Sequence, residues 1–261
     1  MESDSRDGGL GALVRAAVAA VPRPFRRVAV ASVASDERLA ALTSTLADEG
    51  LRAPLVNPSS GLHLALERPE TCGFDRQYAA RAALGRQAGP CVVVDAGTAL
   101  TVDAVVPAGH PSARALEAIG GTAPVDVAGV FLGGAIAPGP RMLAEALGRG
   151  GARLWEVDLS PDAPALGRSS DEAMRSGVVV GHAGAAVHLA RAVARGAGLG
   201  ELDRATPVWL TGGAAPFVRY ALEEAFGSEL HVATGLVLEG LAAAIGGTGS
   251  DRERGWAEGV L

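Results

Sequence analysis

The sequence CVVVDAGTALTVDAVV, residues 91–106, decides how the fold of this chain is interpreted. A run of β-branched residues ends on Asp95, Gly97 and Thr98 follow at once, and a second strand-like run begins. Two apolar runs joined by a short glycine-containing link predict a β-hairpin, whose Asp and Gly could serve only to form the turn. The alternative is a binding site, because a glycine lets a phosphate approach the backbone and a carboxylate can hold a cation. The hairpin alone leaves both interpretations open.

Two further acidic residues have ordinary structural explanations. Asp103 alternates with apolar neighbours in the second strand, so solvent exposure is the expected outcome, with the interior of a cleft as the alternative. Asp75 lies in the segment ETCGFDRQYAA at the start of an expected helix, where its spacing favours an N-cap. The chemical alternative is that Asp75 accepts a proton from a substrate hydroxyl while Arg76 binds a carboxylate or a phosphate.

The composition is that of a soluble globular protein. The 261 residues allow one large domain or two small ones, with 48% apolar and 20% charged residues. Aromatic residues make up only 4%, so the core must consist of Ala, Val and Leu. We expect no membrane association, because no apolar run approaches the roughly 18 residues that cross a bilayer. The polar, acidic N-terminus differs from a secretory signal, and we therefore expect a cytoplasmic protein.

The charged residues and the cysteines exclude several function classes. The net charge is -6, and the 23 Lys and Arg residues are all arginine. The sequence shows no basic patch of the kind that predicts nucleic-acid binding. Without lysine the chain can form neither a GxxxxGK[ST] phosphate loop nor a lysine Schiff base. Cys72 and Cys91 form no CxxC pair and no metal-binding spacing, so we expect two buried thiols.

Strands and helices alternate along the second half of the chain, which predicts an α/β protein with a mostly parallel or mixed sheet. Three strands end in glycine turns, in the sequences DAGT, LGGAIAPG and LTGG. Turns of this kind expose backbone N–H groups that can hold phosphates. Gly212 and Gly213 suit the nucleoside or phosphates of a nucleotide, and a structural turn is the alternative. The expected helices cover residues 36–49, with Asp36 as a candidate N-cap, then 74–85, 140–147, 171–196, 214–226 and 235–245.

Five motifs in this order resemble those of the type III pantothenate kinases, a family that includes the Bvg accessory factors. They are GFDR (73–76), VVVDAGTALTVD (92–103), LGGAIAPG (132–139), LGRSSDEAMRSG (166–177) and VWLTGG (208–213). The resemblance covers roughly residues 28–245. It implies the superfamily of acetate and sugar kinases, Hsp70 and actin, in which two RNase H-like domains enclose a nucleotide cleft. It also implies a homodimer.

The resemblance implies a role for each residue that matches the substrate motifs. Asp75 matches the catalytic residue, which accepts the proton of the pantothenate hydroxyl. Gly73, Phe74 and Arg76 fall in the segment that lines pantothenate. Ser170 stands where the family commonly has a threonine that reaches pantothenate across the dimer interface.

The resemblance likewise implies how ATP and cations are bound. Asp95 matches the ligand of a monovalent cation, K⁺ or NH₄⁺. Thr98 matches the ATP-contacting threonine of the second phosphate loop. From their glycine turns, we expect Gly97, Gly212 and Gly213 to contribute to ATP binding as well. The implied reaction transfers the γ-phosphoryl group of ATP, with Mg²⁺, to pantothenate, the first step of coenzyme A biosynthesis.

One departure from the family pattern concerns the first domain. The family usually opens with a DxGNT-type phosphate loop, which this sequence does not show, and we expect a truncated N-terminal RNase H-like domain. The expected division is 1–88, then a C-terminal RNase H-like domain, 89–250, and a loose tail, 251–261. Residues 107–128 resemble an insertion. Two alternatives are a catalytically impaired accessory member that needs a partner, and a kinase for another small hydroxyl compound.

Overall fold

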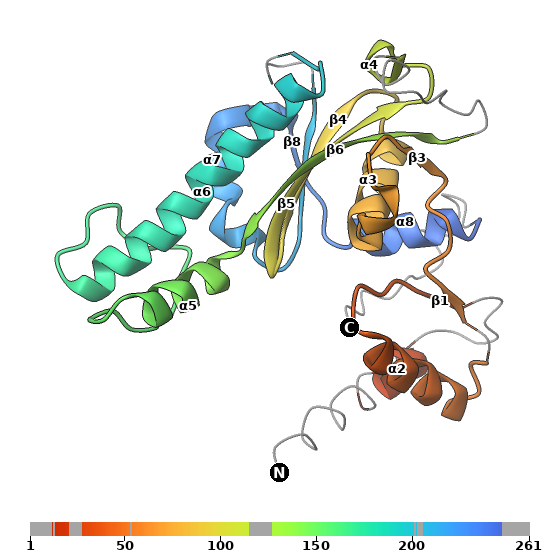
Figure 1. Ribbon diagram of the computed structural model, residues 1–261, viewed down its shortest axis with the longest axis horizontal. Coiled ribbons are helices and arrows are strands. Elements are labelled where there is room, and N and C mark those ends of the chain that lie inside the picture. The colour runs from red at the N-terminus through yellow and green to blue at the C-terminus, as the bar shows by residue number, and fades with distance from the viewer. Residues whose placement is uncertain are drawn as a thin grey trace.

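A six-stranded mixed sheet forms the centre of the computed structural model, which describes residues 12, 14–20, 28–52, 54–114, 127–200, 202 and 206–246 (Figure 1). The strands lie in the order β3-β6-β5-β4-β7-β8. Strand β5 is antiparallel to both of its neighbours, and the other pairs are parallel. The bounds are β3 (Leu62–Leu64), β4 (Cys91–Ala96), β5 (Ala99–Pro107), β6 (Gly129–Pro138), β7 (Val208–Thr211) and β8 (Leu230–Val232). The predicted mixed α/β fold is therefore confirmed.

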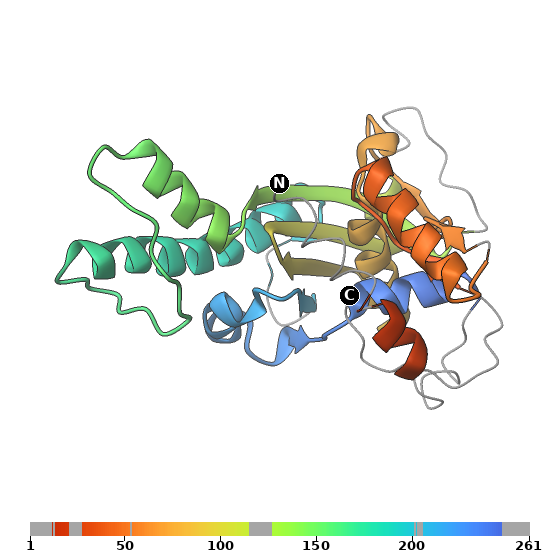
Figure 2. The same ribbon diagram turned by 90° about the horizontal axis from the view of Figure 1, so that it is seen from below.

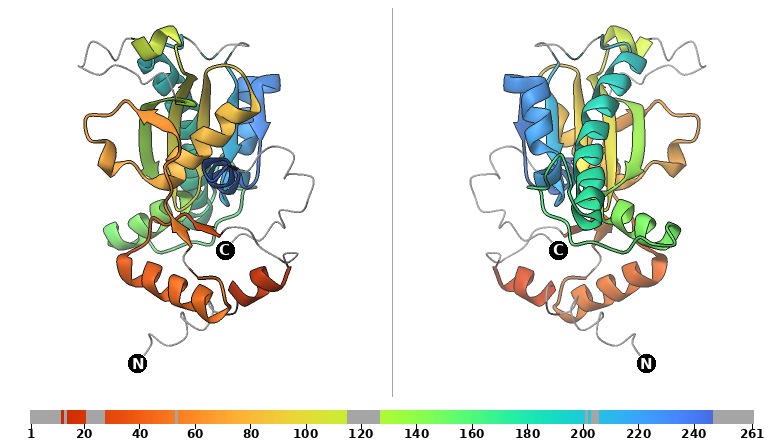
Figure 3. Two further views of the ribbon diagram at one scale, coloured as in Figure 1. Left: turned by 90° about the vertical axis from the view of Figure 1, so that its right-hand side faces the viewer. Right: turned by 90° about the vertical axis from the view of Figure 1, so that its left-hand side faces the viewer.

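Helices cover both faces of this sheet. Helices α3 (Phe74–Arg86) and α8 (Leu236–Ala244) pack on one face, and α6 (Ser170–Gly196) and α7 (Arg219–Phe226) pack on the other (Figure 3). Helix α5 (Pro140–Gly150) and the N-terminal half of α6 project beyond the sheet as an arm (Figures 1 and 2). The short helical elements are α4 (Pro111–Arg114), η1 (Pro69–Thr71), η3 (Ala215–Phe217) and η4 (Gly227–Glu229).

The N-terminal part of the described chain forms a small separate cluster. Strand β1 (Ala29–Val30) pairs in parallel with β2 (Leu55–Val56), and helix α2 (Asp36–Asp48) lies beside them (Figure 1). The cluster has its own apolar core, made of Val14, Val18, Val30 and Leu46. Strands β1 and β2 are each only two residues long.

Two expected helix features differ from the structure, and two other expected segments fall partly or wholly outside the described residues. Ser35, in extended conformation, is the N-cap of α2, and Asp36 is already its first helical residue. The expected helix over 214–226 is divided into η3 and α7, with a proline in the first turn of η3. The expected insertion at 107–128 lies partly outside the described residues, and the tail lies wholly outside them.

The expectation that no segment is long and apolar enough to cross a membrane is wrong for α6. Its 27 residues pass that test by length and composition, with a mean hydropathy of 1.3 in one window. The same helix packs Ala186, Ala190 and Ala194 against the sheet, where all three are fully buried. The apolar character of α6 therefore has a structural cause, because a helix that lies on a sheet must present an apolar stripe.

Helices α3 and α8 approach each other closely at one glycine. A side chain at Gly240 would overlap the backbone carbonyl of Tyr78 in α3. We predict that Gly240→Ala lowers the free energy of unfolding by about 1–3 kcal/mol, because the two helices must separate to make room. Urea denaturation would measure the change.

Gly85→Ala in α3 is the matched control. Gly85 is exposed, and a Cβ there meets no atom within 4 Å. Alanine in this helix should leave stability unchanged or raise it by up to about 1 kcal/mol. Equal stability of the two variants would contradict the proposed packing constraint.

Candidate active site

The β4–β5 hairpin places its acidic residues on the face that α3 covers. Asp95 pairs with Thr101, and Val93 pairs with Asp103, so alternation puts these four side chains on one face. Val93 belongs to the apolar core beneath α3 and α8, whereas Val92 and Val94 belong to the core beneath α6. The hairpin is thus confirmed, and its two carboxylates lie on the α3 side.

The glycine turn after β7 meets the end of β4. Gly212 has φ +96, and a Cβ there would overlap both the carbonyl of Ala96 and Oδ1 of Asp95. The N–H of Ala214 donates to the Ala96 carbonyl over 2.7 Å. Gly213 is exposed, with nothing near its Cβ position. Only a residue without a side chain in this left-handed conformation lets the turn and the carboxylate approach so closely.

The glycine turn after β6 meets the hairpin from the other side. The N–H of Gly139 donates to the carbonyl of Thr98 over 3.1 Å. A Cβ at Gly139 would overlap the carbonyls of Gly97 and Thr98. The three predicted glycine turns therefore meet at one edge of the sheet, and the exposed Thr98 lies between the other two.

The first turn of α3 brings the GFDR residues to the same edge. Gly73 is the N-cap and Asp75 is the second helical residue, so the expectation that Asp75 caps the helix is wrong. The carboxylate of Asp75 folds back toward Gly73, where an added Cβ would overlap Oδ1. An acid in the first turn is favoured by the positive end of the helix dipole. Phe74 lies 6.0 Å from the ring of Tyr78 and is partly buried.

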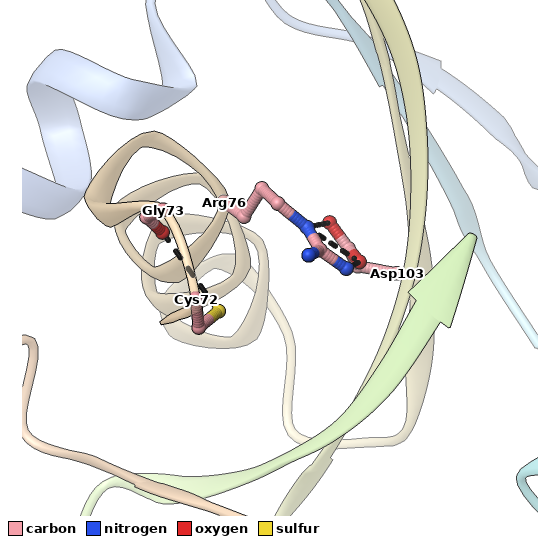
Figure 4. Close-up of polar contacts among 4 residues, drawn as sticks. All are labelled: Cys72, Gly73, Arg76 and Asp103. Carbon is pink, nitrogen blue, oxygen red and sulfur yellow. Dashed lines mark hydrogen bonds and ion pairs between the residues drawn. The ribbon is translucent and has the colours of Figure 1, made fainter. Parts of the chain in front are cut away.

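Arg76 forms an ion pair with Asp103 in β5 (Figure 4). Its Nε lies 3.2 Å from each carboxylate oxygen, and its Nη2 lies 2.5 Å from Oδ1. The guanidinium also lies 5.4 Å from the ring centre of Phe131. Asp103 is buried, with 1% of its surface exposed, so the expectation that it faces solvent is wrong. A buried carboxylate is stable here because a guanidinium satisfies it.

Burial and mutual repulsion shift the carboxylates of this site. Burial raises the pKa of Asp95 to about 6, and the charges of Asp75 and Asp103 add to the shift. Burial also raises the pKa of Asp103, although Arg76 opposes the shift. Three carboxylates share one guanidinium, so the cluster has a net charge of about -2 when all are ionised. Such a site favours a bound cation.

The residues at Asp95 fit a single cation better than a preformed metal cluster. Within the ranges that the structure describes, no three His, Cys, Asp or Glu side chains converge on one point. A monovalent cation, or Mg²⁺ held largely by phosphate and water, needs only one or two carboxylates from the protein. Asp95 beside an open glycine turn is suited to that role.

Ser170 lies apart from the other site residues within this chain. It is the first residue of α6, where Ser169 caps the helix by accepting from the N–H of Glu172. Glu172 in turn accepts from the N–H of Arg168, and Trp155 donates to Asp171 over 2.5 Å. These contacts hold the exposed Ser170 on the arm. Ser170 lies about 24 Å along the helix from Ala186, where α6 packs on the sheet.

The structure thus unites most, but not all, of the predicted site. It brings together Gly73, Asp75, Arg76, Asp95, Gly97, Thr98 and Gly212 near the β4–β5 hairpin. Asp103 is the residue that sequence reasoning missed. The hairpin register held the signal, because a residue two positions beyond the partner of Asp95 must share its face.

The comparisons with known proteins agree on one family. A family model described as Type III pantothenate kinase matches residues 2–112 and 121–192. The type III pantothenate kinase of Streptomyces coelicolor is 36% identical over 168 residues, which cover 64% of this chain and 55% of that protein. That of Thermobifida fusca is 36% identical over 168 residues, which cover 64% of this chain and 57% of that protein.

A solved structure gives a weaker likeness. It is a Baf family transcriptional activator from Campylobacter jejuni, which aligns with a TM-score of 0.47 and 18% identity over 85% of this chain and 83% of that one. A likeness of this degree carries no argument about function.

The fold and the edge site define a mixed α/β protein with glycine turns suited to phosphate groups. The chain belongs to the type III pantothenate kinase family, because the family model matches more than half of it. The matched stretch spans little more than half the length of the Streptomyces and Thermobifida relatives.

The raised pKa of Asp95 predicts a pH dependence of stability in buffers without K⁺, NH₄⁺ or Mg²⁺. Its pKa of about 6 in the folded state lies above the usual value near ~3.9. The stabilisation from the protonated carboxyl is therefore fully present below about pH 4 and is lost as the pH rises through about 6. Asp95→Asn should remove this loss, so the variant should be more stable than the wild type above pH 6.

Thermal unfolding between pH 4 and 8 would measure the difference. Asp158→Asn, at an exposed position, controls for the loss of one formal charge. A stability difference between wild type and Asp95→Asn that does not change with pH would contradict the prediction. Saturating K⁺ should restore wild-type stability above pH 6 if the cation binds at Asp95.

Proposed function

We propose that this protein transfers the γ-phosphoryl group of ATP to the hydroxyl of pantothenate, as the first step of coenzyme A biosynthesis. The observation that carries the proposal is the meeting of Asp75, Asp95 and three glycine turns at one edge of the sheet. Family membership adds the substrate, pantothenate, and the phosphoryl donor, ATP. The fold we infer is that of the acetate and sugar kinase, Hsp70 and actin superfamily.

The reaction assigns one task to each group. The pantothenate oxygen attacks the γ-phosphorus, the bond to the bridging oxygen of ADP breaks, and Asp75 accepts the hydroxyl proton. Thr98 and the backbone of Gly97 bind phosphate oxygens at the exposed hairpin turn. Gly212 and Gly213 form the turn that receives the nucleotide. Phosphoryl transfer of this kind depends mainly on positioning and on neutralising charge.

Cations supply the remaining neutralisation. Asp95 would hold K⁺ or NH₄⁺, and Mg²⁺ would bind chiefly to the phosphates of ATP. Within the chain, the carboxylate cluster with its net negative charge supports this assignment. Both cysteines are free thiols, which is consistent with the cytoplasmic location that we propose.

A coupled assay of ADP release tests the reaction directly. The assay contains ATP, Mg²⁺, K⁺ and pantothenate, and pantothenate is omitted from the control. We expect pantothenate-dependent turnover that Asp75→Asn lowers by about 10²- to 10⁴-fold, because the general base is lost. Asp158→Asn should turn over at the wild-type rate. Unchanged activity in Asp75→Asn would show that another group accepts the proton.

We also propose a homodimer in which Ser170 completes the site of the partner copy. Ser170 is the first residue of α6, whose N-terminal half projects on the arm away from α3, the helix that carries Asp75 (Figure 1). The arm, the segment 151–169 that joins its two helices and the end of β6 beside it expose several large apolar side chains, as a protein interface does. They are Ile136 (65% exposed), Met142, Leu154, Trp155, Leu166 (74% exposed) and Val180.

Mixing two variants tests this arrangement. Ser170→Ala and Asp75→Asn each damage a different half of the shared site. In a mixed dimer, one site has Asp75 from one chain and Ser170 from the other, so activity per Ser170→Ala chain should rise on mixing. Light scattering would establish the oligomeric state. No gain in activity from an exchanging dimer would place Ser170 outside the partner's site.

A catalytically impaired accessory member is the second candidate. In the described segments, only the β4–β5 hairpin carries an Asp-x-Gly-Thr turn, whereas the family pattern also includes a DxGNT-type phosphate loop before it. For either candidate, we propose that the chain divides into two domains, residues 1–88 and 89–250. Calorimetry separates the candidates, because an accessory member should not bind ATP on its own, and tight binding would reject it.

A further inference from the structure

We propose that Asp103 is a positioning residue that holds Arg76 so that one edge of its guanidinium faces the reactants. The proposal rests on the proposed kinase function and adds a residue to it. The Nε and Nη2 edge of Arg76 faces Asp103 (Figure 4). No described residue accepts a bond from Nη1, so this nitrogen is available to a ligand.

The exposed fractions of the two side chains show which member of the pair lies deeper in the protein. The Asp103 side chain is 2% exposed, whereas that of Arg76 is 13% exposed. Asp103 is therefore the buried anchor, and Arg76 is the member that reaches the surface of the site. A bidentate pair of this kind fixes the plane of the guanidinium as well as its position.

Strand β6 is shaped to admit the carboxylate. Asp103 pairs with Gly134, where a Cβ would overlap Oδ1 of Asp103 and the carbonyl of Val102. The neighbouring Gly133 has φ +107, next to a shift in register between Ala104 and Val105. Gly134 leaves the carboxylate room to face Arg76, because any side chain at 134 would occupy the same space.

The ligand of the Nη1 edge is an anionic oxygen. Arg76 follows Asp75 in the first turn of α3, and the charge of Asp75 acts on the Arg76 guanidinium, which therefore lies near the group that accepts the proton. Two reactants offer such an oxygen, which are the carboxylate of pantothenate and the transferring phosphoryl group. Arginine suits both, because its planar fork binds one anion while holding another.

A second ion pair on the same helix provides a matched control. Arg86, at the end of α3, pairs with Glu239 of α8, also through Nε and Nη2. It lies ten residues, or roughly 15 Å, along the helix from Arg76. Glu239→Gln therefore breaks the same kind of contact away from the site. If Asp103 only anchors α3, both variants should behave alike.

The test compares kcat and KM of wild type, Asp103→Asn and Glu239→Gln, corrected for the folded fraction from urea denaturation. We expect Asp103→Asn to lose about 10- to 100-fold in kcat/KM, as a misplaced reacting group does. Glu239→Gln should keep the wild-type values. Values for Asp103→Asn that match Glu239→Gln would overturn the proposal.

A neutral substrate identifies the anion. Pantothenyl alcohol has a hydroxyl in place of the carboxylate of pantothenate. If Nη1 binds the carboxylate, Asp103→Asn raises KM for pantothenate and leaves KM for the alcohol unchanged. If Nη1 binds the phosphoryl group, kcat falls with both substrates. Either pattern supports the positioning role of Asp103.

Two further measurements separate this inference from the proposed function. Wild-type turnover tests the kinase alone, and the affinities for ATP and pantothenate by calorimetry test the positioning role without turnover. In an inactive wild type, equal affinities in Asp103→Asn and Glu239→Gln would overturn the proposal. If Asp103→Asn fails to fold, Arg76→Lys takes its place in the test. Lysine stays charged but cannot bridge two anions, so Arg76→Lys should show the same loss in kcat/KM. A wild-type value of kcat/KM in Arg76→Lys would reject the positioning role.

Discussion

The ion pair between Arg76 and Asp103 joins the first turn of α3 to the middle of the sheet. Hydrogen bonds of Gln77 and Tyr78 tie the same end of the helix to Ser60 and Pro58, but neither reaches the sheet strand that carries Asp103. With the ion pair, the helix end is fixed to β5, two residues from the partner of Asp95. Removal of one member of a buried pair costs about 3–5 kcal/mol, so the contact stabilises the fold as well as the site.

The electrostatics of the site follow from this pairing. Arg76 pairs with Asp103. Among the contacts described, Asp75 and Asp95 therefore form no ion pair with a cationic side chain of the protein. Their mutual repulsion and the burial of Asp95 raise its pKa to about 6. A bound cation would reverse this effect. This edge of the sheet therefore carries a net negative charge. A kinase needs such a charge where it binds cations together with the phosphates of ATP.

Backbone contacts also determine where the three glycine turns lie. Gly139 and Gly212 each press against carbonyls of the β4–β5 hairpin at distances that exclude any side chain. The turns therefore converge because three separate strands end at one edge, and because each carries a glycine where it meets its neighbour. The arm formed by α5 and α6 differs from this edge, because it exposes large apolar side chains such as Met142 and Val180.

The amino-acid sequence by itself determined the order of strands and helices, the hairpin and the residue types at each glycine turn. Local rules suffice there, since alternation, turn chemistry and helix periodicity act over a few residues. It did not determine that Asp103 is buried, that Gly73 rather than Asp75 caps α3, or that Ser170 lies apart. The alternation of side chains along a strand assigns them to two faces, but it does not determine which face a helix will cover. Only tertiary packing brought α3, whose Arg76 lies 27 residues before Asp103 in the chain, over that face. This contact made the Asp103 side chain part of a buried ion pair, although the strand pattern had favoured solvent exposure.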